Sequence, residues 1–152
     1  MNKAINYLLI FISLVSSSGC SYSQKPAEEQ QATEMLRHFY IAQSSIKSIP
    51  HDIGKMDSLQ KIYCSKKLRK KLREQFQLTG LDHDLLTNDY GIDSLGVKTL
   101  SISKDPEKNN NYIVSYTILD DVVPNLSKKE IKVIINVTIL KEDGVFKVDD
   151  IK

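Results

Sequence analysis

Two hydrophobic periods divide this chain, and the change from one to the other falls near Gly96. From Ala27 to Ile46, apolar side chains recur every three or four positions, which predicts a helix with one buried stripe. The helix is expected to end before Pro50, because the residue that precedes a proline disfavours helical backbone. The pattern therefore predicts helices in the first part of the chain and strands in the second.

Two further helices are predicted after the first. Asp57 or Ser58 is the candidate cap of a short one. Lys66 to Gln77 predicts another, in which apolar side chains repeat every four residues, basic ones fill most of the rest, and Ser65 is the candidate cap. Leu81 to Asp93 is expected to form a helix of one or two turns followed by an irregular loop.

The alternating period after Gly96 predicts four strands. They span Val97 to Ser103, Tyr112 to Leu119, Ile131 to Leu140 and Val145 to Ile151. Asp143-Gly144 is a strong signal for a two-residue hairpin turn, which would place Glu142 opposite Val145 and Ile139 opposite Val148.

This register predicts one apolar face for the hairpin. It collects Ile131, Val133, Ile135, Val137, Ile139, Phe146 and Val148. The other face carries Lys132, Asn136, Thr138, Lys147 and Asp149. A slip of one residue would scramble this division. The sequence thus predicts an α+β fold, with N-terminal helices packed on one face of a curved, about four-stranded antiparallel sheet.

The segment before the first helix has the pattern of an export signal. Lys3 precedes an apolar run from Ala4 to Val15, which is too short to cross about 30 Å of hydrocarbon. The junction Ser17-Ser18-Gly19-Cys20 that follows resembles the lipobox of bacterial lipoproteins. The resemblance implies cleavage before Cys20 and lipid on its thiol. The alternative is an ordinary secretory signal with an incidental cysteine.

These features predict three parts: a signal peptide at 1–19, a lipidated tether at 20–27 and a single domain at 28–152. The expected location is the bacterial envelope, with the protein anchored to a membrane through Cys20, and to the outer membrane in a Gram-negative host. If Cys20 carries lipid, Cys64 is the remaining thiol and no intramolecular disulfide forms. Cys64 is interpreted as a small buried hydrophobe. The net charge of +2 gives no reason to expect a nucleic-acid partner.

The order of elements and the end of the chain carry a second resemblance. Asp143, Gly144, Phe146, Val148, Asp149 and Ile151 match the last hairpin of the cystatin-like cone in the nuclear-transport-factor-2-like superfamily. Within it, the chain is most similar to small bacterial lipoproteins of the domain of unknown function 3828 family. Further points of similarity are Phe39-Tyr40, Tyr63, Ser65, Leu68 and Asp89. The superfamily includes enzymes, carriers and scaffolds, so the resemblance implies a fold and not an activity.

The basic side chains of the third helix are a candidate patch for anionic surfaces. They are Lys66, Lys67, Lys70, Lys71 and Arg73. The alternative is a solvated helix face that pairs with aspartates before the sheet: Asp82, Asp84 and Asp89. A second candidate site is the lining of a cone cavity, which the resemblance suggests for Tyr40, Asp89, Tyr112 and Tyr116. The alternative for the tyrosines is a place in the core.

The sequence contains no catalytic constellation. The three histidines are scattered, and the Glu34/His38 pair fits a surface ion pair better than a metal site. Phosphate loops, nucleophile elbows and paired cysteines are absent from it. We therefore expect no cofactor and a non-enzymatic binding or structural domain. The alternatives are an inhibitor or immunity lipoprotein that caps a toxin or hydrolase, with an envelope protein as partner, and a carrier or enzyme that uses the cone cavity.

Overall fold

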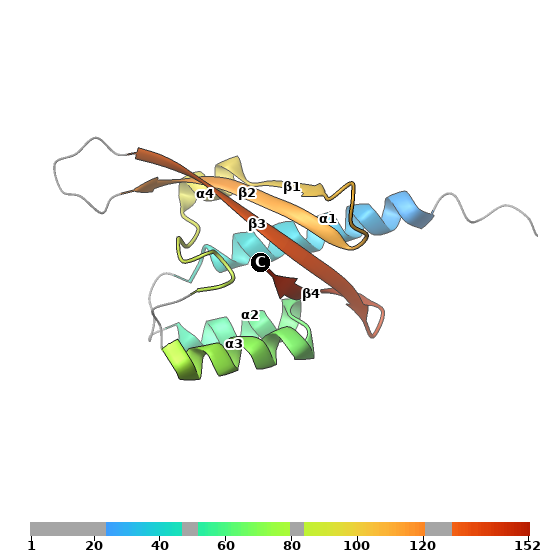
Figure 1. The fold of residues 1–152 in the computed structure, drawn as a ribbon, viewed down its shortest axis with the longest axis horizontal. Coiled ribbons are helices and arrows are strands. Elements are labelled where there is room, and N and C mark those ends of the chain that lie inside the picture. Colours follow the sequence, from blue (N-terminus) through green and yellow to red (C-terminus); the bar gives the residue numbers. More distant parts are fainter. Residues whose placement is uncertain (1–23, 47–51, 80–83, 121–128) are drawn as a thin grey trace, which may run out of the picture.

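The computed structural model describes residues 24–46, 52–79, 84–120 and 129–152, so Cys20 and the predicted signal peptide lie outside the described residues. Its elements are α1 (Gln24–Gln43), α2 (Ile53–Tyr63), α3 (Lys66–Thr79), α4 (Ser94–Thr99), β1 (Ser101–Lys104), β2 (Asn111–Asp120), β3 (Lys129–Glu142) and β4 (Val145–Ile151). Figure 1 shows the long α1 behind the sheet, with α2 and α3 below it.

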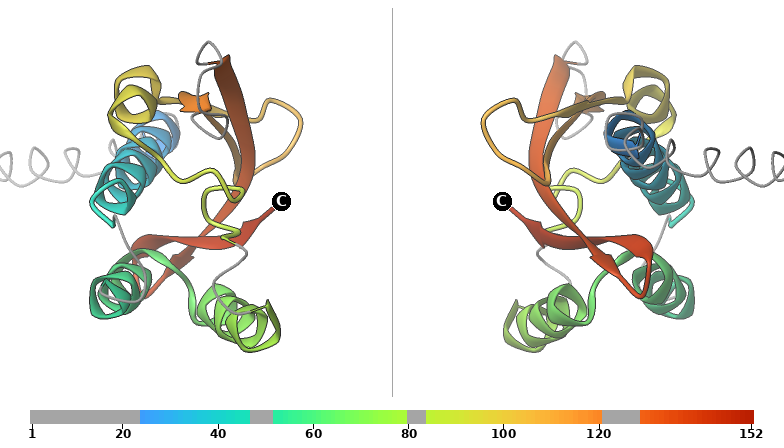
Figure 2. Two further views of the ribbon diagram at one scale, coloured as in Figure 1. Left: turned by 90° about the vertical axis from the view of Figure 1, so that its left-hand side faces the viewer. Right: turned by 90° about the vertical axis from the view of Figure 1, so that its right-hand side faces the viewer.

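The strands form one open antiparallel sheet in the order β1-β2-β3-β4. The predicted α+β class is therefore confirmed. Helices α1 and α4 lie against one face of the sheet, and α2 and α3 lie side by side beyond β4 (Figure 2). On the opposite face, Thr138 Oγ1 donates to Asn111 Oδ1 at 3.0 Å across β2 and β3.

The core lies between α1 and the sheet. Helix α1 buries Ala32, Leu36, Phe39 and Tyr40, which share one side of the helix because they are spaced by three or four residues. Alternate residues of β2 and β3 meet them: Tyr112, Val114, Tyr116, Val133, Ile135 and Val137. The apolar residues of the predicted helix and strand patterns therefore pack into one hydrophobic core.

The β3–β4 hairpin follows the predicted register. Asp143 and Gly144 have φ values of 52° and 79°, as a two-residue turn with left-handed backbone requires. Glu142 pairs with Val145, and Ile139 pairs with Val148. The outer edge of β4 is covered, because Cys64 forms a parallel bridge with Val148 and the following residue, Ser65, donates its N–H to the Val148 carbonyl at 2.8 Å. The connection between α2 and α3 thus protects this edge strand.

A bulge in β4 corrects one prediction of the alternating pattern. Ile139 pairs with Val148 but Thr138 pairs with Asp150, so Asp149 has no partner across the ladder. The extra residue reverses which side chains of β4 face the core from that point onward. Asp149 is therefore buried, where strict alternation placed it on the polar face, and Ile151 enters the core.

Two helix starts also differ from the prediction. Helix α1 begins at Gln24, within the segment expected to be a tether, and it tolerates Pro26 because the first turn needs no N–H from that residue. Helix α2 begins at Ile53, so the predicted caps Asp57 and Ser58 are wrong. The Oγ atom of Ser58 instead donates to the Gly54 carbonyl one turn earlier, which shows that it lies inside the helix.

The segment before the sheet departs most from the prediction. Its described part, from Asp84 onward, is a series of turns with left-handed backbone at Asn88, Asp89 and Gly91, and not a helix. Helix α4 then covers residues that alternation assigned to the first strand. The Asp93 carboxylate accepts a hydrogen bond from the Gly96 N–H at 2.7 Å, and this cap starts the helix. Strand β1 is correspondingly short.

Candidate functional site

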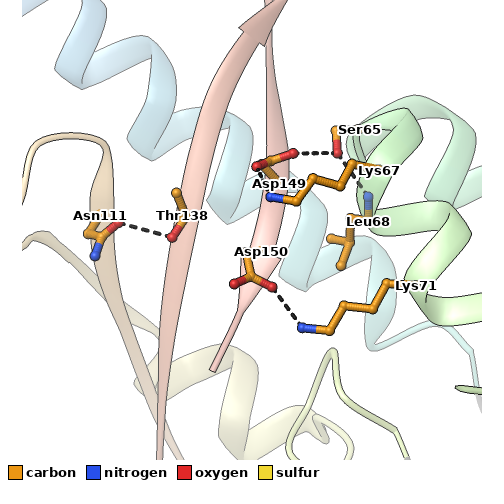
Figure 3. A network of polar contacts seen from close by, with 8 residues as sticks. All are labelled: Ser65, Lys67, Leu68, Lys71, Asn111, Thr138, Asp149 and Asp150. Carbon is orange, nitrogen blue, oxygen red and sulfur yellow. Dashed lines mark hydrogen bonds and ion pairs between the residues drawn. The ribbon is translucent and has the colours of Figure 1, made fainter.

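Polar side chains join helix α3 to strand β4 (Figure 3). Ser65 Oγ accepts a hydrogen bond from the Leu68 N–H at 3.0 Å, which confirms Ser65 as the cap of the helix. The same hydroxyl donates to Asp149 Oδ1 at 2.8 Å. Both Ser65 and Asp149 are buried, so this pair fixes the start of α3 against the bulge in β4.

Two lysines of α3 reach carboxylates of β4. Lys67 Nζ lies 2.8 Å from Asp149 Oδ2, and Lys71 Nζ lies 2.7 Å from Asp150 Oδ1. The hydrogen bond to Asp149 raises the pKa of Lys67. At Asp150, burial opposes ionisation, but the hydrogen bond and charge of Lys71 outweigh it and lower the pKa of the carboxyl. The charges of both lysines are thus compensated within the domain.

These ion pairs predict a pH dependence of stability. Because folding lowers the pKa of Asp150, its contribution is present above the pKa of the unfolded carboxyl and is lost as pH falls through the lowered value. Lys71→Met removes the partner, so we expect it to lower the free energy of unfolding near neutral pH and to match the wild type near pH 2. Denaturant unfolding at both pH values measures the difference. A difference that does not change with pH would contradict the pairing.

The five basic residues of the predicted patch fall on two sides of α3. Lys67 and Lys71 face the carboxylates of β4. Lys66, Lys70 and Arg73 are exposed, and their spacing of four and three residues places them on one outward line. Their side of the helix is therefore the part of the patch that faces away from β4.

Two acidic partners of α3 come from strand β4, which the sequence did not suggest. Asp149 pairs with Lys67, and Asp150 pairs with Lys71. Asp84 accepts from the Thr87 hydroxyl at 2.5 Å and so helps to organise its own turn. Asp82 lies outside the described residues.

The candidate cavity residues do not form one set. Tyr40, Tyr112 and Tyr116 are buried, and the ring centres of Tyr40 and Tyr116 are 6.5 Å apart. Asp89 is exposed in the turn before α4, where its side chain accepts a hydrogen bond from the Asp84 N–H. The structure therefore brings two tyrosines together inside the core and leaves Asp89 outside it.

The two central tyrosines use their hydroxyls differently. Tyr116 donates to the Gly91 carbonyl at 2.9 Å and lies 3.1 Å from the Thr87 carbonyl, which ties the turn to β2. The Tyr40 hydroxyl is buried and has no hydrogen-bond partner among the described residues. Burial raises the pKa of both phenols. Tyr116 thus holds the turn in place, whereas the Tyr40 hydroxyl forms no hydrogen bond within the described part of the chain.

The remaining candidate groups occupy separate places. Cys64 is buried, and burial raises the pKa of its thiol to about 12, as expected of a small core residue. His38 is exposed on α1, and His51 and His83 lie outside the described residues. In the described ranges, no three His, Cys, Asp or Glu side chains converge on a metal position. None of the helices in those ranges is long and apolar enough to cross a membrane.

Comparisons with known proteins support the fold. No protein-family model matches the sequence, and no curated protein matches it either. The chain is similar to the crystal structure of a protein of unknown function from Bacteroides thetaiotaomicron, with a TM-score of 0.69 and 26% sequence identity. The similarity covers 86% of this chain and 95% of the other. Most of this fold is therefore shared by the two proteins.

Sequence reasoning missed the role of Asp149 and Asp150. The available signal was their position side by side in a strand, where alternation sends one side chain inward and the other outward. A lysine pair four residues apart, Lys67 and Lys71, was the complementary signal on α3. The two signals are about 80 residues apart along the chain, and only the folded arrangement joins them.

Proposed function

We propose that this chain is a lipid-anchored protein of the bacterial cell envelope whose domain binds a partner and catalyses no reaction. The sequence around Cys20 supports the anchor. The observation that carries the binding role is the division of α3, which is fixed to β4 by Lys67 and Lys71 while Lys66, Lys70 and Arg73 remain exposed. A helix held on one side offers the other to a partner.

The start of α1 determines how such an anchor would hold the domain. Helix α1 begins at Gln24, so three residues separate it from Cys20. Three residues span at most about 11 Å. In Figure 1 this start lies at the same end of the molecule as the β3–β4 hairpin. The proposed anchor would therefore keep that end close to the membrane.

The finer fold assignment is also a proposal. We infer that the sheet and α1 form a cystatin-like cone of the nuclear-transport-factor-2-like superfamily, and that the chain is related to the domain of unknown function 3828 family. The order of elements, with α1 and two further helices before the sheet, supports this. The buried positions of Tyr40, Tyr112 and Tyr116 favour a packed core over the alternative of a carrier or enzyme.

Lipidation is tested by intact mass after expression in a bacterium. We expect the wild type to begin at Cys20 and to carry acyl chains, and to incorporate labelled palmitate. Cys20→Ser should abolish the label, because the thiol that accepts lipid is gone. Cys64→Ser is the matched control, since its thiol is buried, and it should retain the label. An uncleaved or unmodified wild type would overturn the anchor.

A further inference from the structure

Helix α3 presents charge and apolar surface on the same exposed segment. Lys66, Lys70 and Arg73 form the outward line described above, which we call the basic line. Lys70 Nζ is 3.7 Å from Glu74 Oε1, but both side chains are largely exposed, so this pair neutralises little of the line. The outward side of α3 therefore keeps most of its positive charge.

The end of α3 adds two large apolar side chains. Phe76 is 46% exposed and Leu78 is 86% exposed. Leu68, in the first turns of the same helix, is fully buried against the domain. The apolar contacts of α3 are thus concentrated near its start. Phe76 and Leu78 are two residues apart and lie on different sides of the helix. Phe76 follows Arg73 by three residues and therefore borders the basic line. Leu78 follows Lys71 by seven residues and lies on the side of Lys67 and Lys71. Aromatic and aliphatic residues within a polar rim are typical of protein interfaces.

The position of this surface makes the membrane that would hold the anchor a poor candidate for its binding partner. Helices α1 and α3 run in the same direction in Figure 1, so the end of α3 lies toward the same end of the molecule as the end of α1, away from the start of α1. Helix α1 has 20 residues and is about 30 Å long. The tether from Cys20 spans about 11 Å. This step rests on the proposed anchor, which places the membrane at the opposite end of the domain.

We propose that the basic line, together with Phe76 at its end, is a docking surface for a protein partner with an acidic surface beside an apolar residue. The basic line attracts and orients the partner. Phe76, which is 46% exposed, supplies the apolar contact that gives affinity once the two surfaces meet. Lys67 and Lys71 lie off this line, because their side chains are directed to Asp149 and Asp150 of β4.

Two labelled peptides test this surface on the full chain at low ionic strength. One contains glutamate alone, and the other has leucine at every fourth position of the same length. We expect the wild type to bind both, and to bind the leucine peptide about tenfold more tightly. Combined Lys66→Glu, Lys70→Glu and Arg73→Glu should weaken both peptides about tenfold or more. Phe76→Ser should remove only the preference for the leucine peptide, and Leu78→Ser, on another side of the helix, should retain it.

The matched control reverses three exposed lysines elsewhere, at Lys108, Lys129 and Lys132. It has the same net charge as the first variant and should retain binding within about twofold. Equal weakening by the two triple variants would overturn the proposal, as would absence of peptide binding by the wild type. Binding to phosphatidylglycerol vesicles and not to the peptides would assign the surface to a bilayer instead. Arg73→Glu alone, expected to weaken binding severalfold, replaces the triple variant if that variant does not fold.

The peptide experiment and the lipidation experiment fail independently. Peptide binding by α3 does not require lipid on Cys20, and the mass of the mature protein does not depend on α3. A lipidated protein with an inert α3 would remove the docking surface alone. An unlipidated protein with peptide binding would remove the anchor and leave the docking surface in place.

Discussion

Asp149→Ala will lower the free energy of unfolding by about 3 kcal/mol, because it removes a charged acceptor from a buried hydrogen bond and leaves the Ser65 hydroxyl without that partner. Asp149 is 9% exposed, and it lies 2.8 Å from both Ser65 Oγ and Lys67 Nζ. Most of the cost comes from Ser65, since the Lys67 side chain is 70% exposed and its ion pair is weak. Denaturant unfolding at neutral pH measures this change.

Two variants separate the buried contact from the exposed ones. Asp149→Asn keeps an acceptor for Ser65, so it should cost about half as much as alanine. Asp150→Ala removes only the more exposed pair with Lys71 and should cost less than about 1 kcal/mol. Equal losses of unfolding free energy for Asp149→Ala and Asp150→Ala would show that the buried Ser65–Asp149 contact stabilises the fold no more than the exposed pair does.

A double-mutant cycle provides an independent check of the same contact. Ser65→Ala removes the cap of α3 and the donor to Asp149 together. Because each single change already breaks the Ser65–Asp149 bond, the double variant should be more stable than the sum of the single losses predicts. Additive losses would indicate that the two side chains act independently.

The hairpin shows what could be predicted from the sequence. Asp143-Gly144 favours one turn type, and that turn determines the register of the first pairs. The apolar residues on one side of β3 confirm it, because Val133, Ile135 and Val137 all enter the core. The turn residues and the buried face of β3 indicate the same register, so the alternation of apolar and polar residues predicted the hairpin correctly.

The bulge and α4 show why the remainder was not predictable. At Asp149, one extra residue reverses which side chains of β4 face the core. The hydrogen bond that stabilises this arrangement comes from Ser65, 84 residues away in the sequence. At Gly96, the Asp93 cap starts a helix where alternation predicts a strand. A Cβ at Gly96 would lie 3.2 Å from the Tyr116 ring, so glycine also permits α4 to pack closely on β2. Both features depend on contacts with other elements.

The candidate surface was predictable in composition and not in detail. The basic run of α3 is visible in the sequence, but the separation of Lys67 and Lys71 from Lys66, Lys70 and Arg73 depends on where β4 lies. Helical spacing alone gives relative faces and does not say which face meets the domain.

Tyr116→Phe will lower the free energy of unfolding by about 2 kcal/mol, whereas Tyr40→Phe will leave it unchanged or raise it by up to about 1 kcal/mol. The two residues are matched, since both rings are buried and each variant removes one oxygen atom. Tyr116 loses a hydrogen bond of 2.9 Å to the Gly91 carbonyl, and with it the tie between β2 and the turn. Tyr40 loses a hydroxyl that is buried without a partner in the described structure. Denaturant unfolding of both variants measures the contrast.

The Tyr40 result also bears on the alternative of a carrier or enzyme. A hydroxyl that only fills the core costs free energy to bury, so its removal cannot weaken the fold by much. If Tyr40→Phe instead destabilises the protein by more than about 1 kcal/mol, the hydroxyl must bond to a buried water molecule or a small polar ligand. Such a partner would lie close to Tyr116, and it would restore the tyrosine pair as a candidate binding site inside the core.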